Sequence, residues 1–64
     1  MIKISNFLDH IDDKVKLTDI DGKVWEGILG ITTDYDSDTD YILVIQENVA
    51  VQFGELEIAN IEIL

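Results

Sequence analysis

The sequence predicts an all-β domain: a short N-terminal helix followed by a five-stranded antiparallel sheet, strongly bent into a partly open barrel. Three observations support this prediction. Hydrophobic residues make up 47% of the chain, and most are isoleucine, valine or leucine, whose side chains favour pleated sheets. Apolar and polar residues alternate along several short segments. Turn residues separate these segments, and the chain has no proline. The 64 residues suffice for a single domain, residues 1–64.

The helix is expected over about residues 4–12. Apolar side chains recur there at the spacing of one helical stripe: Ile4, Phe7, Leu8 and Ile11. Ser5 is the expected N-cap, because its hydroxyl can accept a hydrogen bond from a free N–H of the first turn. So short a helix is unstable alone, and we expect it to cover the open end of the barrel.

The five strands are expected over residues 14–20, 23–33, 41–46, 49–53 and 58–63. Asp21-Gly22 joins the first two, since glycine reaches positive φ without steric cost. Gly27 and Gly30 lie inside the second strand, where glycine allows a sharp bend. Residues 34–40 are expected to form a polar loop. Glu47-Asn48 is the next turn, in which asparagine tolerates the left-handed region.

The chain resembles small Sm-like (LSM-domain) proteins. The stretches that carry the resemblance are the helix ISNFLDHI, the first hairpin VKLTDIDGKVWEGIL and the closing segment VQFGELEIANIEIL. The first hairpin of Sm proteins reads roughly V-x-L-x-x-G-x-x-x-x-G-x-L, and comparable places here hold Val15, Leu17, Gly22, Gly27 and Leu29. The hairpin and the I-x-x-I ending are also similar to short Sm-like proteins of Gram-positive bacteria and their phages. The resemblance implies an Sm-like or SH3-like barrel over nearly the whole chain.

The RNA site of Sm proteins is only partly matched. Those that bind uridine-rich RNA carry Asp and Asn before the third strand, and Arg-Gly or a basic equivalent before the fifth. The first loop here reads DYDSDTD, which leaves Asp34 and Tyr35 as candidate RNA residues. The second reads FGELE, with Gly54 but no arginine. A net charge of −10 also repels nucleic acid and anionic membranes, so we expect neither as a partner.

Sm proteins form rings in which the fourth strand of one subunit pairs with the fifth strand of the next. The resemblance therefore implies a cyclic homo-oligomer. Residues 49–53 and 58–63 contain no lysine or proline, the residues that commonly guard a sheet edge. The expected interface residues are Val49, Val51, Phe53, Ile58, Ile61 and Ile63. A monomer is the alternative, since short barrels also fold alone. Because the subunits repel, assembly should strengthen with salt or divalent cations.

Four aspartates form the densest polar motif: Asp34, Asp36, Asp38 and Asp40. Their spacing by two is typical of the opening ligands of a calcium loop, but the glycine and glutamate of such a loop are missing. A cation site and a solvated hairpin loop therefore both stay open. Among the aromatic side chains, we expect Trp25, Tyr41 and Phe53 in the core or an interface, and Tyr35 exposed.

No catalytic constellation is present, so we expect neither enzymatic activity nor a cofactor. The chain lacks cysteine, and His10, its one histidine, lies beside Asp9 without a nucleophile. No apolar run approaches the roughly 18 residues of a membrane span, and the N-terminus lacks the apolar core of a signal peptide. These features predict a cytoplasmic protein.

The favoured function is a non-enzymatic Sm-like module that self-assembles through its edge strands and binds a protein partner. Two alternatives belong to other classes. One is single-stranded RNA binding in an Sm-like ring, and the other is an acidic phage-type inhibitor that mimics nucleic acid and occupies a basic protein. The simplest interpretation of the acidic surface itself is solubility.

Overall fold

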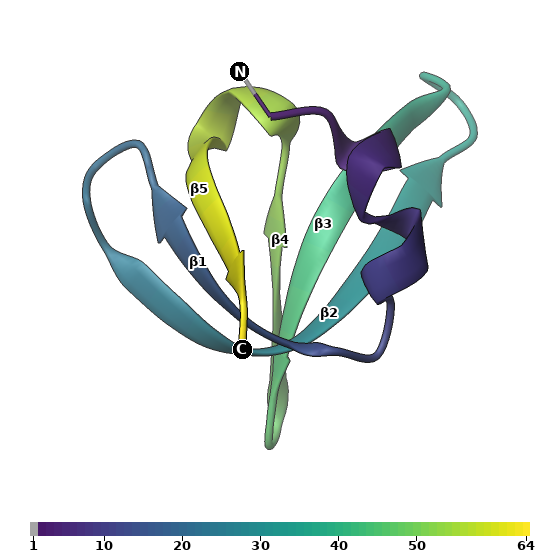
Figure 1. The fold of residues 1–64 in the computed structure, drawn as a ribbon. Helices are drawn as coiled ribbons and strands as arrows, with labels where there is room; N and C mark the ends of the chain where they lie inside the picture. Colours follow the sequence, from purple (N-terminus) through teal and green to yellow (C-terminus); the bar gives the residue numbers. More distant parts are fainter. Residues whose placement is uncertain (1) are drawn as a thin grey trace.

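The strands form one open antiparallel sheet. The computed structural model describes residues 2–64. Its elements are η1 (Ile4–His10), β1 (Lys14–Asp19), β2 (Val24–Asp34), β3 (Thr39–Gln46), β4 (Val49–Phe53), η2 (Glu55–Glu57) and β5 (Ile58–Ile63). The five strands lie in the order β4-β3-β2-β1-β5 (Figure 1). The prediction of an antiparallel five-stranded domain with a short N-terminal helix is confirmed, and the sheet is not closed.

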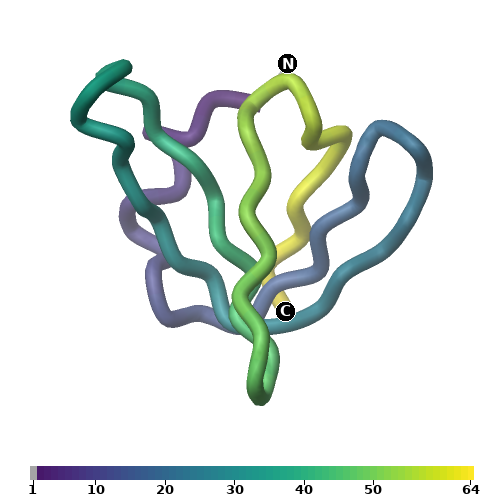
Figure 2. The backbone as a smooth tube through the Cα atoms, turned by 180° about the vertical axis from the view of Figure 1, so that it is seen from behind, coloured from purple at the N-terminus to yellow at the C-terminus, as the bar shows by residue number. Residues whose placement is uncertain are grey.

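The strands fan out from a common base. Figure 1 shows the β1–β2 and β2–β3 hairpin tips at opposite upper corners, with the β3–β4 turn at the bottom. Figure 2 shows the same arrangement from behind, with η1 on the side of β2 and β3. Because β2 belongs to both upper hairpins, its path determines where the two tips stand.

The strand bounds agree closely with the predicted ones. β4 and β5 begin and end at the expected residues, and β1 ends one residue earlier. The largest difference is in residues 34–40, where the predicted loop shortens to a turn over residues 35–38. Asp34 pairs with Thr39, and Thr33 pairs with Asp40. The polar composition therefore marks solvent-exposed strand ends, which sequence alone does not separate from a loop.

The Glu47-Asn48 turn differs from the prediction in backbone geometry, and the turn of residues 35–38 contains a left-handed residue that was not predicted. Glu47-Asn48 is a turn as predicted, but Asn48 does not occupy the left-handed region. Among the described non-glycine residues, only Asp12 and Asp38 have positive φ, at 75° and 53°. Asp38 therefore supplies the left-handed residue of the β2–β3 hairpin. Gly22 has a φ of 84°, as the first hairpin requires.

The N-terminal helix differs from the prediction in type, length and cap. It is a 3-10 helix of seven residues, and Lys3 rather than Ser5 is the N-cap, without a side-chain cap bond. The Ile4 N–H instead donates to Glu55 Oε1 at 3.0 Å. A 3-10 helix has three residues per turn, so the face toward the protein carries Ile4, Phe7 and His10. Leu8 and Ile11, which an α-helix would place on that face, are exposed.

The core lies on one side of the sheet, called the inner face here. Its buried members are Ile4, Val15, Leu17, Leu29, Ile42, Val44, Phe53, Ile58 and Ile61. Gly27 lies on this face opposite Val15. A Cβ on Gly27 would stand 2.5 Å from the carbonyl oxygen of Ile45. The close approach of β3 to β2 therefore needs a glycine at this position.

Candidate functional site: two free edges and an acidic pocket

Among residues 2–64, the outermost strands, β4 and β5, each have one side without a strand partner. In the sheet, β4 pairs only with β3, and β5 pairs only with β1. The side chains of both strands alternate between the two faces. Val49, Val51 and Phe53 lie on the inner face of β4, since Val51 pairs with Val44 and Phe53 with Ile42. Both free edges thus carry apolar side chains on the inner face.

On β5, the inner-face positions are Ile61 and Ile63, which pair with Leu17 and Val15. A register shift between Thr18 and Asp19 places Ile58 on the same side, where it is buried. Glu62 lies on the other face, opposite Lys16. The β5 edge therefore also carries apolar side chains on the inner face, although the register shift interrupts the alternation between Ile58 and Ile61.

The six expected interface residues divide into two groups. Phe53, Ile58 and Ile61 are buried in the chain's own core, so their side chains are not available to a second copy. Val51 is half-buried, while Val49 and Ile63 are 56% and 38% exposed. What the edges can offer a second copy is therefore their backbone groups and these last three side chains.

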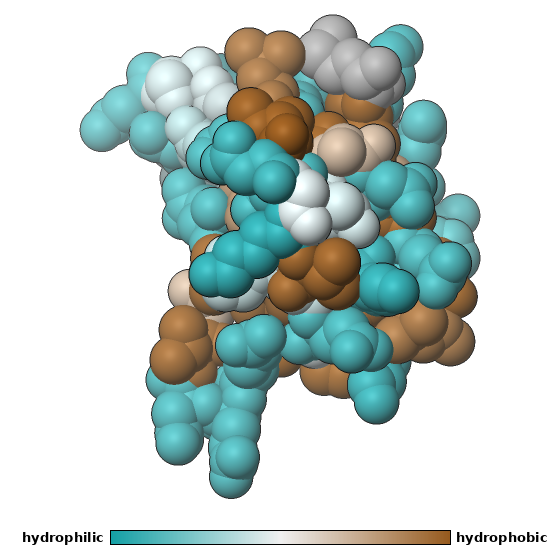
Figure 3. Space-filling model, turned by 90° about the vertical axis from the view of Figure 1, so that its left-hand side faces the viewer, coloured by the Kyte–Doolittle hydropathy of each residue, from teal (hydrophilic) through white to brown (hydrophobic). Residues whose placement is uncertain are grey.

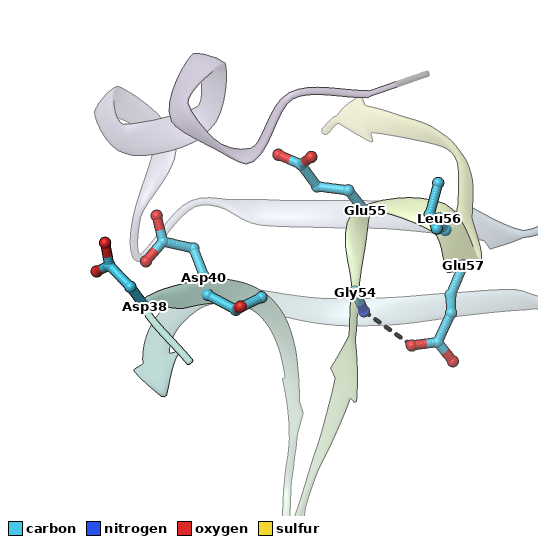
Figure 4. A pocket seen from close by; sticks show the side chains of 7 residues that line it. Asp38, Asp40, Gly54, Glu55, Leu56 and Glu57 are labelled. Atoms are coloured by element: carbon cyan, nitrogen blue, oxygen red, sulfur yellow. Dashed lines mark hydrogen bonds between the residues drawn. The ribbon is translucent and has the colours of Figure 1, made fainter. Parts of the chain in front are cut away.

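An open pocket of about 640 Å³ lies between the β2–β3 hairpin and η2 (Figure 4). It is lined by Asp38, Thr39, Asp40, Gly54, Glu55, Leu56 and Glu57. Two loops far apart in sequence thus meet at one site. These are the loops to which the Sm resemblance assigns RNA contacts, yet the lining holds four carboxylates and no lysine or arginine. Gly54 lies here, whereas Asp34 and Tyr35 are not among the lining residues.

Hydrogen bonds hold the walls of this pocket. Glu57 Oε1 accepts a hydrogen bond from the Gly54 N–H at 2.9 Å (Figure 4), and the Glu57 N–H donates to the Gly54 carbonyl at 3.0 Å. Glu55 Oε1 accepts the N–H of Ile4, which ties η2 to the start of η1. On the opposite wall, Asp40 Oδ1 accepts the Thr33 hydroxyl at 2.6 Å. The pocket is therefore built from anchored segments of the fold.

The structure does not bring the four aspartates of the predicted cation site together. Asp34 and Asp40 occupy neighbouring pairs of the β2–β3 ladder and so point to opposite faces. Asp34 Oδ1 accepts the N–H of Asp36 at 3.0 Å, which is a turn bond. Within residues 2–64, no three or more acidic, histidine or cysteine side chains are placed to hold a metal ion. The solvated hairpin is the interpretation that this geometry favours.

The aromatic side chains and His10 follow the sequence interpretation in part. Tyr35 is 89% exposed and Phe53 is buried, while Trp25 and Tyr41 are half-buried. The Trp25 and Phe53 rings meet edge to face, with centroids 5.6 Å apart. His10 Nδ1 lies 3.0 Å from Asp13 Oδ2 rather than beside a nucleophile.

Asp19 is a structurally important residue that the sequence analysis missed. Its Oδ1 accepts the N–H groups of Asp21 and Lys23, each at 2.9 Å. Its Oδ2 accepts the indole N–H of Trp25 at 3.2 Å. The Trp25 bond, with help from the backbone bonds, lowers the pKa of Asp19 below its ordinary value. The sequence did contain a signal for this role. Asp19 stands at the start of a hairpin turn, where an aspartate side chain can accept hydrogen bonds from nearby backbone N–H groups.

Apolar side chains also reach the surface near both upper hairpins. Ile20 is 65% exposed and Leu56 is 77% exposed. The Ile20 N–H donates to the Glu57 carbonyl at 3.1 Å, so the first hairpin tip is fastened to η2. Figure 3 views the side that carries this hairpin and shows hydrophobic groups in patches separated by hydrophilic ones.

None of the helices in residues 2–64 is long and apolar enough to cross a membrane. Comparisons of the chain with protein-family models, with curated proteins and with solved structures found no match.

Proposed function

We propose that this chain is a non-enzymatic Sm-like module, folded as a strongly bent and partly open barrel. It self-assembles through its edge strands into a cyclic homo-oligomer and binds a protein partner. One observation supports self-assembly above all: β4 and β5 are the two outer strands of the sheet, and both lack a partner on one side. An unpaired edge presents a row of N–H and C=O groups that another strand can pair with.

The side chains at the two edges fit such a contact. Val49 and Val51 on β4 and Ile63 on β5 all lie on the inner face and all keep exposed surface. Pairing β4 of one copy with β5 of the next would remove this surface from water, which is favourable by about 25 cal/mol per Å². Because the two edges differ, the contact is head-to-tail and closes into a ring when the rotation allows.

Charge limits this assembly and gives it a signature. Each copy adds a formal charge of −10, and salt screens the resulting repulsion over about 10 Å at 0.1 M. The β4 segment VAVQF carries no charge. It therefore forms no attractive ion pair across the contact that salt could weaken. Assembly should therefore increase with ionic strength.

Solution mass tests the proposal. We expect light scattering to give a multiple of the 7.3 kDa chain mass that rises with sodium chloride. Val49→Lys should abolish assembly, because it places a charge on the inner face of β4 inside the contact. Gln52→Lys is the matched control: it adds the same charge to the same strand, but on the outer face opposite Leu43. A monomer at every concentration and salt level would refute self-assembly.

A mixing experiment tests the head-to-tail geometry. Ile63→Lys should block the β5 edge as Val49→Lys blocks the β4 edge. Each variant alone should be a monomer, while the mixture should form a dimer, because it contains one intact β4 and one intact β5. A symmetric β4–β4 contact predicts the opposite result, since Ile63→Lys alone would then still dimerise.

The acidic pocket weighs against RNA as the ligand. The two loops that the resemblance implies for RNA do meet, but they bring four carboxylates and no cation to the pocket. Lysine and arginine supply the electrostatic part of nucleic-acid affinity by neutralising phosphates. We expect no binding in a titration with a uridine-rich oligonucleotide at low salt, where electrostatic attraction is strongest. Saturable binding there would favour the RNA function over the proposed one.

A further inference from the structure

We propose that the pocket between the β2–β3 hairpin and η2 is the docking surface for a partner segment in which lysine or arginine alternates with an apolar residue. This inference rests on the proposed function, because it names the chemistry of the protein partner. It concerns a different part of the surface from the β4 and β5 edges.

The pocket has the charge that such a segment needs. Asp38 and Asp40 stand on one side, and Glu55 and Glu57 stand on the other (Figure 4). Within residues 2–64, the only contact at salt-bridge distance joins His10 and Asp13, and no lysine makes one. In this part of the chain, no lysine therefore pairs directly with the four pocket carboxylates. Three of them accept one hydrogen bond each from within the chain, which leaves their second oxygen for a cation from a partner.

The lysines that the structure places by other contacts lie away from this pocket. Lys16 is paired across the sheet with Glu26 on one side and Glu62 on the other. The Lys23 ammonium stands 4.3 Å from the centre of the Trp25 ring. Lys3 stands nearer, because it directly precedes Ile4, whose N–H bonds Glu55. The residues that line the pocket nevertheless carry charge of one sign, which attracts cations and orients them during encounter.

Exposed apolar side chains favour a polypeptide over a simple cation. Leu56 belongs to the pocket wall and is 77% exposed, and Tyr35 projects from the same hairpin as Asp38 with 89% exposure. A metal ion or a polyamine would leave both side chains in water. An apolar side chain of a partner can cover Leu56, while a lysine or arginine can also stack on the face of Tyr35. The surface therefore fits a segment with both kinds of residue.

The test uses the full chain and three blocked synthetic peptides: Arg-Leu-Arg-Leu-Arg, Arg-Gly-Arg-Gly-Arg and Gln-Leu-Gln-Leu-Gln. Affinity is measured by calorimetry at low salt, and the site is located from amide shifts in NMR spectra. We expect the Arg-Leu peptide to bind most tightly and to shift the amides of residues 38–40 and 54–57. Leu56→Ala should remove the advantage of the Arg-Leu peptide over the Arg-Gly peptide.

Paired charge variants separate the pocket from the overall charge. Asp38→Asn with Asp40→Asn should weaken the Arg-Leu peptide about tenfold, the effect of two modest surface charge pairs. Asparagine tolerates the positive φ of Asp38 and can still accept the Thr33 hydroxyl at position 40. The matched control is Asp9→Asn with Asp12→Asn, which removes the same charge outside the pocket at another positive-φ aspartate. It should change the affinity less than twofold.

Several outcomes would overturn the inference. Equal effects of the two double variants would mean that only net charge matters, and peptide shifts elsewhere would place the site on another surface. Saturation of the same amides by calcium chloride alone would make the pocket a metal site. A change of solution mass in the Asp38/Asp40 variant would mean that a second copy covers the pocket. Failure here leaves the mass results for Val49→Lys and Gln52→Lys intact, so the two proposals are judged separately.

Discussion

The two upper hairpins both have acidic tips, yet their carboxylates take part in hydrogen bonding to different degrees. In the β1–β2 hairpin, Asp19 directs both oxygens inward and accepts three hydrogen bonds, from Asp21, Lys23 and Trp25. In the β2–β3 hairpin, Tyr35 is almost fully exposed, and Asp38 and Asp40 form one wall of the acidic pocket. An aspartate near a turn can thus hold the turn together or present charge to a partner. Asp40 does both, because its Oδ1 accepts the Thr33 hydroxyl while its side chain lines the pocket.

The largest effect should come from the strand that the two hairpins share. Gly27→Ala would place a methyl group 2.5 Å from the Ile45 carbonyl oxygen, and a backbone atom cannot move aside cheaply. We expect the free energy of unfolding to fall by about 1–3 kcal/mol, as for other overpacked sites, in urea titrations followed by Trp25 fluorescence. Gly30→Ala is the control, because its nearest neighbour is the mobile Ile45 Cδ1 at 3.2 Å. Equal losses in the two variants would contradict this account of β2.

The next effect should come from Asp19. Asp19→Ala removes the acceptor for three N–H groups, and we expect a clear fall in the urea midpoint. Asp36→Ala, an equal change in the other hairpin, should leave the midpoint nearly unchanged, because the Asp36 side chain accepts none of the bonds found in this turn. Similar midpoints for the two variants would show that the contrast between the hairpins is wrong.

Lowering the pH should test the contribution of the Asp19 carboxylate to stability. The pKa of Asp19 is lowered in the folded chain by its bond to Trp25, whereas an unfolded aspartate titrates near about 3.9. Its contribution to stability is therefore present above the unfolded pKa and is lost as the pH falls through the folded pKa. The urea midpoints of the wild-type chain and of Asp19→Asn should converge as the pH falls from 5 toward 2. Curves that stay parallel would mean that Asp19 has no lowered pKa.

The strands could be predicted well, because alternating side chains and turn residues are visible within a few consecutive positions of the sequence. Alternating valines fixed β4, and Gly22 fixed the first turn at its observed positive φ. The helix type was missed, because the apolar residues at positions 4, 7, 8 and 11 fit an α-helix, while packing selected the three-residue period of Ile4, Phe7 and His10. A helix of seven residues has little stability of its own. The sequence of such a short segment therefore does not decide between α-helical and 3-10 geometry.

The pocket could not be predicted in the same way, because it depends on distance in space. Its walls come from residues 38–40 and 54–57, which the sheet brings together. The sequence drew attention to four aspartates in a row instead, and strand pairing sent Asp34 and Asp40 to opposite faces. The role of Glu55 was invisible for the same reason, since its partner is the backbone N–H of Ile4. Glu57 differs, because it bonds the N–H of Gly54 only three residues before it.

The smallest effect on stability should come from the tip of the β2–β3 hairpin. Tyr35→Ser removes a ring that is 89% exposed, and we expect the free energy of unfolding to change by less than about 0.5 kcal/mol, as for most surface substitutions. The same variant should weaken the Arg-Leu peptide about two- to threefold, since an exposed cation–π contact is worth about 0.5 kcal/mol. A loss of stability without a loss of affinity would assign Tyr35 to the fold. The second hairpin would then resemble the first, and its exposed tip would no longer indicate a binding surface.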